Sequence, residues 1–236
     1  MTRLTKGDAS VPALEAATAA LVRQSARITA ASEAEVRDGF AECNSARVSQ
    51  RWQEELVLQS YLFAGFPRAL NAAREWRRSQ GAAAGDAGER SGVASFASRA
   101  NEGYADVFEW RSRGEETCET VYGEFYAKLR GNIRALSPAL DEWMIVEGYG
   151  KVLSREGLDL GRRELCIVAA CAAAGQDRQL HSHLHGALNA GVPASVVRAA
   201  LEVLVGVVRE DSLVRARLLL GRVVGKATAE PRSSGR

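Results

Sequence analysis

The sequence has little of what would mark a disulfide scaffold, a membrane span or a nucleic-acid binder. Its 236 residues include only four cysteines, so we expect no disulfide framework. No apolar run approaches the ~18 residues of a spanning helix, and the first dozen residues hold no apolar block like that of a signal peptide. The net charge is only +2, from 31 basic and 29 acidic residues. We therefore expect a soluble, cytoplasmic protein with no nucleic-acid or membrane partner.

Strand signals are also missing. No stretch shows sustained alternation or β-branched enrichment, whereas apolar residues recur at three- and four-residue spacing almost throughout. The composition, 46% hydrophobic and 25% charged, is that of an ordinary globular protein. The pattern predicts an all-α fold.

Two polar, aperiodic segments divide the chain. Residues 80–103 are rich in Gly, Ala and Ser and are predicted to be a linker, and residues 226–236 contain Pro and Gly and are predicted to be a disordered tail. The predicted units are a flexible N-terminus (1–12), a degenerate first helical repeat (13–79), the linker (80–103), a second repeat (104–225) and the tail (226–236).

An internal repeat is suggested by sliding the chain on itself. An offset of 148 residues sets Ala41–Leu56 against Asn189–Leu204 without a gap. Two amphipathic helices can match this well by chance, so the common order of elements carries more weight than the identities. We expect two diverged tandem repeats.

The second copy has clear helix punctuation. A helix is predicted from Arg162 to Ala174, ended by Gly175, and another from about Asp177 to Ala190. Pro193 suits the first turn of a third helix, predicted to run through Val208. This arrangement predicts a small helical bundle.

The three histidines of the chain lie within five residues, as His181, His183 and His185. At about 100° per residue the outer two share one helix face, while His183 points the other way, beside small and apolar neighbours. His-x3-His on a helix can hold zinc, but no third ligand is evident, so two solvated histidines are the better interpretation of the outer pair. We expect no metal.

Glu164 distinguishes His183 from an ordinary core histidine. In a hairpin that turns at Gly175, Glu164 lies ~16 Å before the turn and His183 ~12 Å after it, at ~1.5 Å per residue. A carboxylate at that height can orient and charge-stabilise the imidazole, which suits general acid–base catalysis. A surface glutamate paired with Arg162 or Arg163 is the alternative, and spacing alone favours neither.

The remaining candidates are weaker. Cys166 and Cys171 lie about 140° apart on one helix and cannot pair within it, so each is expected to be a small buried hydrophobe. The aromatic residues could line a site or fill the core: Tyr61, Phe63, Phe66, Trp143 and Tyr149.

The order and spacing of Tyr149-Gly150, Arg163-Glu164-Leu165, Gly175 and His183 resemble the carboxymuconolactone decarboxylase family, part of the alkylhydroperoxidase D-like superfamily. The resemblance covers roughly residues 115–210. It implies an alkylhydroperoxidase D-like helical bundle that forms a homo-oligomer and acts on a small molecule without a cofactor. The N-terminal LQSYLFAGFPRALNA is similar to a segment that closes the family's domain, with Gln59 where the family often has histidine.

The departures from the family narrow the implied chemistry. The Cys-x-x-Cys of the peroxidase branch is replaced by Gln176 and Gln179, so its thiol relay is missing. The resemblance then implies decarboxylase-like acid–base chemistry on a small carboxylated, lactone-like substrate. His183 would be the acid/base, Glu164 its orienting partner and Arg163 the anchor of a substrate carboxylate.

Each copy lacks what the other keeps. At the offset of 148, the N-terminal copy retains FAGFP but has Glu35 where His183 would be. We therefore expect one composite site, with His183 and Glu164 as the catalytic pair. The expected substrate-binding residues are Arg163, Tyr149, Gln59, Tyr61, Phe63 and Phe66. Two alternatives stay open: an alkylhydroperoxidase-type antioxidant that uses a displaced Cys166 or Cys171, and a non-catalytic helical assembly protein.

Overall fold

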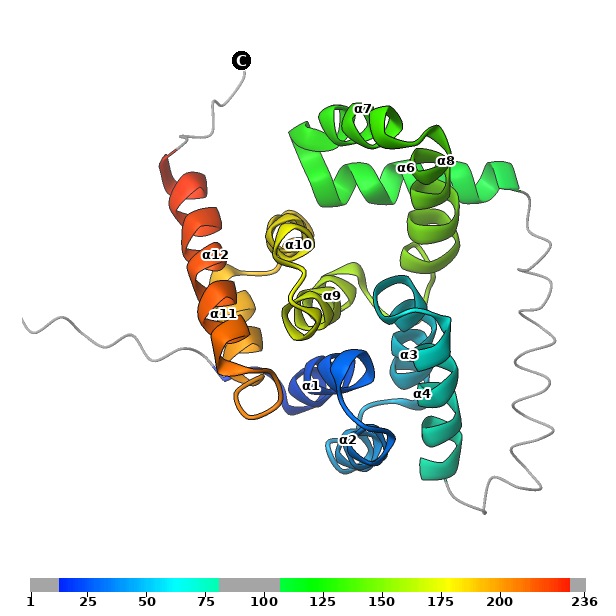
Figure 1. Cartoon of the computed structure of the whole chain (residues 1–236), viewed down its shortest axis with the longest axis vertical. Helices are drawn as coiled ribbons and strands as arrows, with labels where there is room; N and C mark the ends of the chain where they lie inside the picture. Colours follow the sequence, from blue (N-terminus) through cyan, green and yellow to red (C-terminus); the bar gives the residue numbers. More distant parts are fainter. Residues whose placement is uncertain (1–12, 81–106, 230–236) are drawn as a thin grey trace, which may run out of the picture.

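A computed structural model describes residues 13–80 and 107–229, and the regular elements in these ranges are helical (Figure 1). The one β-type contact there is an isolated bridge between Val205 and Val208. The all-α prediction is confirmed for this part of the chain. None of its helices is long and apolar enough to cross a bilayer. The predicted N-terminal segment lies outside the described residues, as do nearly all of the linker and most of the tail.

The helices form two groups in the chain. The first group is α1 (Ala16–Ala30), α2 (Glu33–Ser45), α3 (Gln50–Ala64) and α4 (Phe66–Ser79). The second group is α6 (Val107–Tyr122), the 3-10 turn η2 (Gly123–Phe125), α7 (Tyr126–Leu136), α8 (Pro138–Trp143), the π-helix η3 (Met144–Leu153), α9 (Leu160–Ala174), α10 (Asp177–Asn189), α11 (Ala194–Glu202) and α12 (Glu210–Ala229). Helices α1 and α9 pack together near the centre, and α6 to α8 lie beyond α9 and α10 (Figure 1).

Local signals fix the ends of the central helices. Asp159 caps α9 by accepting a hydrogen bond from the backbone N–H of Arg162 at 3.0 Å. Gly175 ends the helix with φ +67°, a left-handed conformation that glycine adopts without strain. The chain then turns directly into α10, so α9 and α10 form the hairpin that the sequence predicts.

The predicted length of the third helix is wrong. Helix α11 ends at Glu202, short of Val208, and the chain passes through turns before α12 begins at Glu210. Gly206 lies in this connection at φ +79°, which a right-handed helix cannot contain.

The two groups of helices correspond at a different offset from the one predicted. Helices α1 and α9 both have 15 residues, α2 and α10 both have 13, and each pair of starting residues is 144 positions apart. The offset of 148 exceeds this by one helical turn, over which an amphipathic pattern repeats. Gly39 therefore occupies the position of His183, and Glu35 instead closes a capping box with Ser32. The duplication itself stays a prediction.

The two groups share one core. Buried apolar side chains from both form a single cluster, to which Leu21 of α1 and Ile167 of α9 belong. At the α1–α9 contact, Ser25 Oγ donates a buried hydrogen bond to the backbone carbonyl of Cys166 at 2.6 Å. The first group is therefore part of the environment of α9, from which Glu164 projects.

Candidate active site

The α9–α10 hairpin brings together the two side chains singled out in its sequence. Glu164 lies in the second turn of α9 and His183 in the middle of α10. Nδ1 of His183 is 2.9 Å from Oε2 of Glu164. The exposed fraction is 0% for Glu164 and 3% for His183, so the pair is shielded from water.

The ionised carboxylate of Glu164 determines the direction of its hydrogen bond with His183. A carboxylate oxygen accepts, so Nδ1 of His183 carries the proton that it donates to Glu164. This leaves Nε2 as the nitrogen whose lone pair can accept a proton from a substrate. The other carboxylate oxygen, Oε1, is buried and has no hydrogen-bond partner among the described residues. The arrangement can perform general acid–base chemistry.

Gly186 makes room for the carboxylate. It lies three residues after His183 on α10, and a Cβ atom there would lie 2.6 Å from Oε2 of Glu164 and 2.7 Å from Cγ1 of Val121. Real Cβ contacts are not this short, so any larger residue would displace one of the two side chains. Glycine at position 186 therefore sets how closely α9 and α10 approach at the pair.

His183 lines a cavity of about 320 Å³ between α3, α6, η3 and α10. Its lining is mostly aromatic and apolar. The lining residues are Leu62, Phe63, Tyr122, Leu140, Trp143, Met144, Glu147, Gly148, Tyr149, Leu153, Gln179 and His183. The acid–base pair thus stands in the wall of a cavity large enough for a small molecule.

Two tyrosines of the lining face each other in an edge-on contact. The ring centroids of Tyr122 and Tyr149 are 6.2 Å apart. Burial raises the pKa of the Tyr122 hydroxyl to about 12 and raises the pKa of Tyr149 well above its usual value. Both hydroxyls therefore stay protonated at neutral pH and can donate hydrogen bonds.

The first group of helices contributes one of its three predicted aromatic residues to this wall. Phe63 of α3 meets the His183 ring edge-on, with centroids 5.5 Å apart. Tyr61 and Phe66 instead stack on each other at 4.7 Å and do not line the cavity, and Phe66 is 64% exposed. The first group therefore reaches the cavity through Phe63 and its neighbour Leu62, not through Tyr61 or Phe66, and the composite site stays a prediction.

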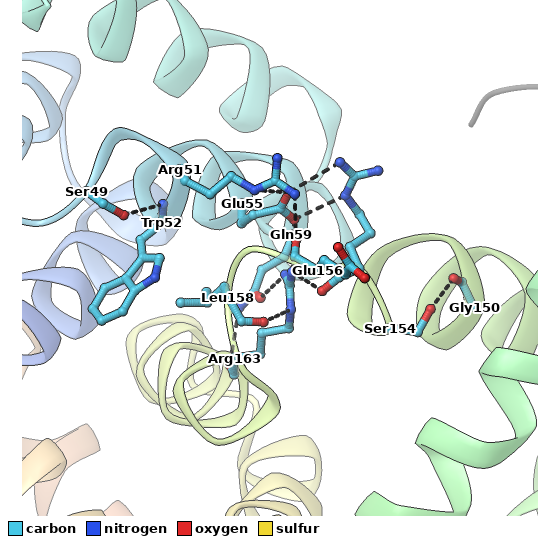
Figure 2. Close-up of polar contacts among 11 residues, drawn as sticks. Ser49, Arg51, Trp52, Glu55, Gln59, Gly150, Ser154, Glu156, Leu158 and Arg163 are labelled. Atoms are coloured by element: carbon cyan, nitrogen blue, oxygen red, sulfur yellow. Dashed lines mark hydrogen bonds and ion pairs between the residues drawn. The ribbon is translucent and has the colours of Figure 1, made fainter. Parts of the chain in front are cut away.

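Arg163 does not reach the cavity, which corrects its expected role as a carboxylate anchor. Its side chain is fully buried, and Nη2 lies 2.9 Å from Oε2 of Glu55 on α3. The guanidinium also donates to the backbone carbonyls of Leu158 and Arg155. Figure 2 shows the guanidinium between Glu55 and Leu158. An arginine whose donors are used in this way holds α3 against the start of α9 and has little left for a substrate.

Gln59 belongs to the same polar cluster. It is buried, donates through Nε2 to the carbonyl of Arg163 at 3.2 Å and accepts from the guanidinium at 3.4 Å (Figure 2). Gln59 is not among the residues that line the cavity. Its expected role in substrate binding is therefore replaced by a structural one.

The outer histidines lie away from the acid–base pair. The rings of His181 and His185 contact each other with centroids 5.0 Å apart, and neither lines the cavity. Within residues 13–80 and 107–229, no three His, Cys, Asp or Glu side chains are grouped so that they could hold a metal ion.

The cysteines are poorly placed for thiol chemistry. Cys43, Cys118, Cys166 and Cys171 are all buried and free. Burial raises the pKa of the Cys171 thiol to about 12 and also raises that of Cys166. The reactive form of a thiol is the thiolate, which these environments suppress.

Several cavity residues have no recognisable signal in the sequence. Tyr122 and Glu147 carry no motif, and they reach the cavity only because α6 and η3 pack together. A close approach between α6 and η3 depends on glycines: a Cβ at Gly150 would overlap the backbone of Trp110. A Cβ at Gly114 of α6 would likewise overlap the backbone of Ile145, so Gly114 and Gly150 are the sequence signals for this packing.

Comparison with known proteins relates residues 125–220 to a known family. Residues 125–220 match the model of the carboxymuconolactone decarboxylase family, which confirms the resemblance seen in the motifs. The chain is also similar to Peroxisomal protein 2 of Schizosaccharomyces pombe, with 29% identity over 157 residues that cover 66% of this chain and 68% of the relative. The range 125–220 that matches the family model contains the α9–α10 hairpin with Glu164 and His183.

Proposed function

Because residues 125–220 match the carboxymuconolactone decarboxylase family and carry a buried Glu164–His183 pair, we propose that the protein is an acid–base enzyme for a small molecule. His183 transfers the proton through Nε2, and Glu164 orients the ring and stabilises its charged form. The observation that carries the proposal is the 2.9 Å contact between Nδ1 and Oε2 in the wall of the cavity. No cofactor is part of the proposed chemistry.

The proposed reaction is proton transfer at the carbon beside a carbonyl group. Decarboxylation and the isomerisation of lactones share this step, because both place a proton on, or remove it from, such a carbon. A single base with a mobile proton at Nε2 suffices for it. A lactone-like carbonyl compound is therefore the proposed substrate.

The thiol alternative is disfavoured by the raised pKa values of Cys166 and Cys171. The assembly-protein alternative predicts no polar pocket around His183, and the mostly apolar cavity does not decide against it; the buried Glu164–His183 pair beside that cavity favours the enzyme. We propose a homo-oligomer, supported by exposed apolar side chains at the two ends of α7, Phe125 and Leu136. A cytoplasmic location is proposed from the sequence, although the similar yeast protein is named peroxisomal.

The test follows exchange of carbonyl-adjacent protons for deuterium in D2O by NMR, with acetophenone and α-phenyl-γ-butyrolactone as probes. We expect the wild-type protein to accelerate exchange, and His183→Gln to lower the rate about 10²–10⁴-fold. His181→Gln, on the same helix but outside the cavity, is the matched control and should retain the wild-type rate. Equal rates for wild type and His183→Gln, or no acceleration of either probe, would contradict the proposal.

A further inference from the structure

The cavity at His183 lacks a cation for an acidic substrate. Among the described residues that line it, no side chain is lysine or arginine, and Glu147 is the one carboxylate. Family resemblance led to the expectation of a carboxylated substrate, which needs a partner of opposite charge once it leaves water. The lining therefore conflicts with that substrate class.

Three cations of the second group of helices already have acidic partners. Lys151 pairs with Glu147 at 3.2 Å and lies over the Trp110 ring at 5.0 Å. Arg130 pairs with Asp141 and also donates to the Tyr126 hydroxyl. Arg163 is buried against Glu55. A substrate carboxylate would have to break one of these pairs to gain a cation.

The lining instead offers aromatic surface and a few polar atoms. Phe63, Tyr122, Trp143 and Tyr149 present rings, while His183 and Gln179 supply polar groups. Because Lys151 balances Glu147, the wall carries no net charge apart from that of a protonated His183. Aromatic walls with one or two polar groups bind apolar ligands and orient a single functional group.

We propose that the substrate is an uncharged ring compound with one carbonyl oxygen, rather than a carboxylate. The cavity volume of about 320 Å³ is at the lower end of small-molecule sites, which suits one or two rings. The ring packs against Phe63 and Trp143, and the carbonyl side faces His183. This inference rests on the proposed function, because it takes the cavity at His183 to be the substrate site.

The experiment uses three aryl ketones that share an acetylphenyl group and differ in the charge and size of the para substituent: acetophenone, 4-acetylbenzoate and 4-acetyl-N,N,N-trimethylanilinium. Their affinities for the full chain are measured by titration, with the His183 ring signals in NMR as the reporter of the site. We expect acetophenone to bind about tenfold or more tightly than 4-acetylbenzoate, because the carboxylate loses water against a wall whose described lining residues include no lysine or arginine. Glu147→Gln should narrow the ratio of these two affinities, because it frees Lys151 from its ion pair.

Glu142→Gln is the matched control, because Glu142 pairs with Arg111 and does not line the cavity. It should leave the ratio unchanged. The inference would be overturned if 4-acetylbenzoate or the ammonium compound bound more tightly than acetophenone. It would also be overturned if none of the three compounds bound. His183→Gln lacks the reporter ring, so its binding is followed by broadening of the acetophenone signals; it should bind acetophenone within about threefold of wild type while losing exchange. Binding without His183-dependent exchange would reject the proposed function and leave the ligand class standing.

Discussion

Two helical hairpins of equal size occupy the centre of the molecule, and only one of them carries an acid–base pair. The α1–α2 hairpin and the α9–α10 hairpin have helices of 15 and 13 residues, 144 positions apart. At that offset Glu164 corresponds to Ala20, and His183 corresponds to Gly39. The backbone arrangement is therefore common to both hairpins, which differ in these two side chains.

Both hairpins seat a buried polar side chain of the first helix beside a glycine of the second. In α1, Gln24 donates to the carbonyl of Val36 at 2.9 Å, and a Cβ at Gly39 would overlap its amide oxygen. In α9, Glu164 occupies the space left by Gly186. The first hairpin pairs the amide nitrogen of Gln24 with the backbone of α2, whereas the second pairs one carboxylate oxygen of Glu164 with a histidine that also reaches a cavity. The other oxygen of each side chain has no hydrogen-bond partner among the described residues.

The largest expected effect comes from breaking the link between the two groups of helices. Arg163→Met leaves Glu55 buried beside the remaining Arg155 without its main partner, and removing one member of a buried pair costs about 3–5 kcal/mol of unfolding free energy. Urea denaturation measures it. Arg209→Met, at an exposed ion pair with Asp211 inside the second group of helices, should cost below about 1 kcal/mol. Equal losses for the two variants would contradict the buried-link account.

The second prediction compares alanine substitutions at the two hairpin glycines, Gly39 and Gly186. Gly39→Ala forces Gln24 out of its hydrogen bond and should cost about 1–3 kcal/mol, less a gain in helix propensity of up to about 1 kcal/mol. The exchange rate per folded molecule should not change. Gly186→Ala displaces Glu164 and should lower that rate at least tenfold. An equal loss of the exchange rate in both variants would contradict the proposed difference in role between the two hairpins.

The smallest effect concerns the caps of the first helices. Asp159 caps α9, whereas Glu15 at the start of α1 makes no side-chain cap. Burial raises the pKa of Asp159, but hydrogen bonds from the backbone and side chain of Arg162 outweigh it and lower the pKa overall. The stabilisation is therefore present above the unfolded pKa of about 4 and is lost as pH falls through the lower folded value.

Asp159→Ala should consequently cost about 1 kcal/mol at pH 7 and less at pH 2. Glu15→Ala serves as the control and should cost less at pH 7, because Glu15 caps no backbone N–H of α1. Chemical denaturation at both pH values measures the difference. A cost for Asp159→Ala that is the same at pH 2 as at pH 7 would exclude an ionised cap.

Local features of the sequence predicted the hairpin well. Gly175 and the helical spacing were enough to place Glu164 and His183 at the same height, because both depend only on helix geometry within one hairpin. Arg163 could not be assigned in the same way. Its partner Glu55 lies 108 residues earlier, and no local pattern reports a pairing at that distance.

The sequence could not predict which aromatic side chains of the first group face the cavity, because that depends on how α3 is rotated about its axis. Tyr61, Phe63 and Phe66 lie close in sequence, yet residues two apart on a helix point about 200° away from each other. Only Phe63 lines the cavity, and the direction of α3 relative to α10 decides which one does. That direction comes from tertiary packing, which also brings Tyr122 and Glu147 to the cavity.

The central claim, that Glu164 orients His183, is tested most directly by the nitrogen resonances of the His183 ring. The chain has three histidines, so loss of one set of signals in His183→Gln assigns them. At a pH where the ring is neutral, we predict the tautomer with the proton on Nδ1 in wild type and loss of that preference in Glu164→Gln. A proton on Nε2, or a ring that does not respond to Glu164→Gln, would contradict the account.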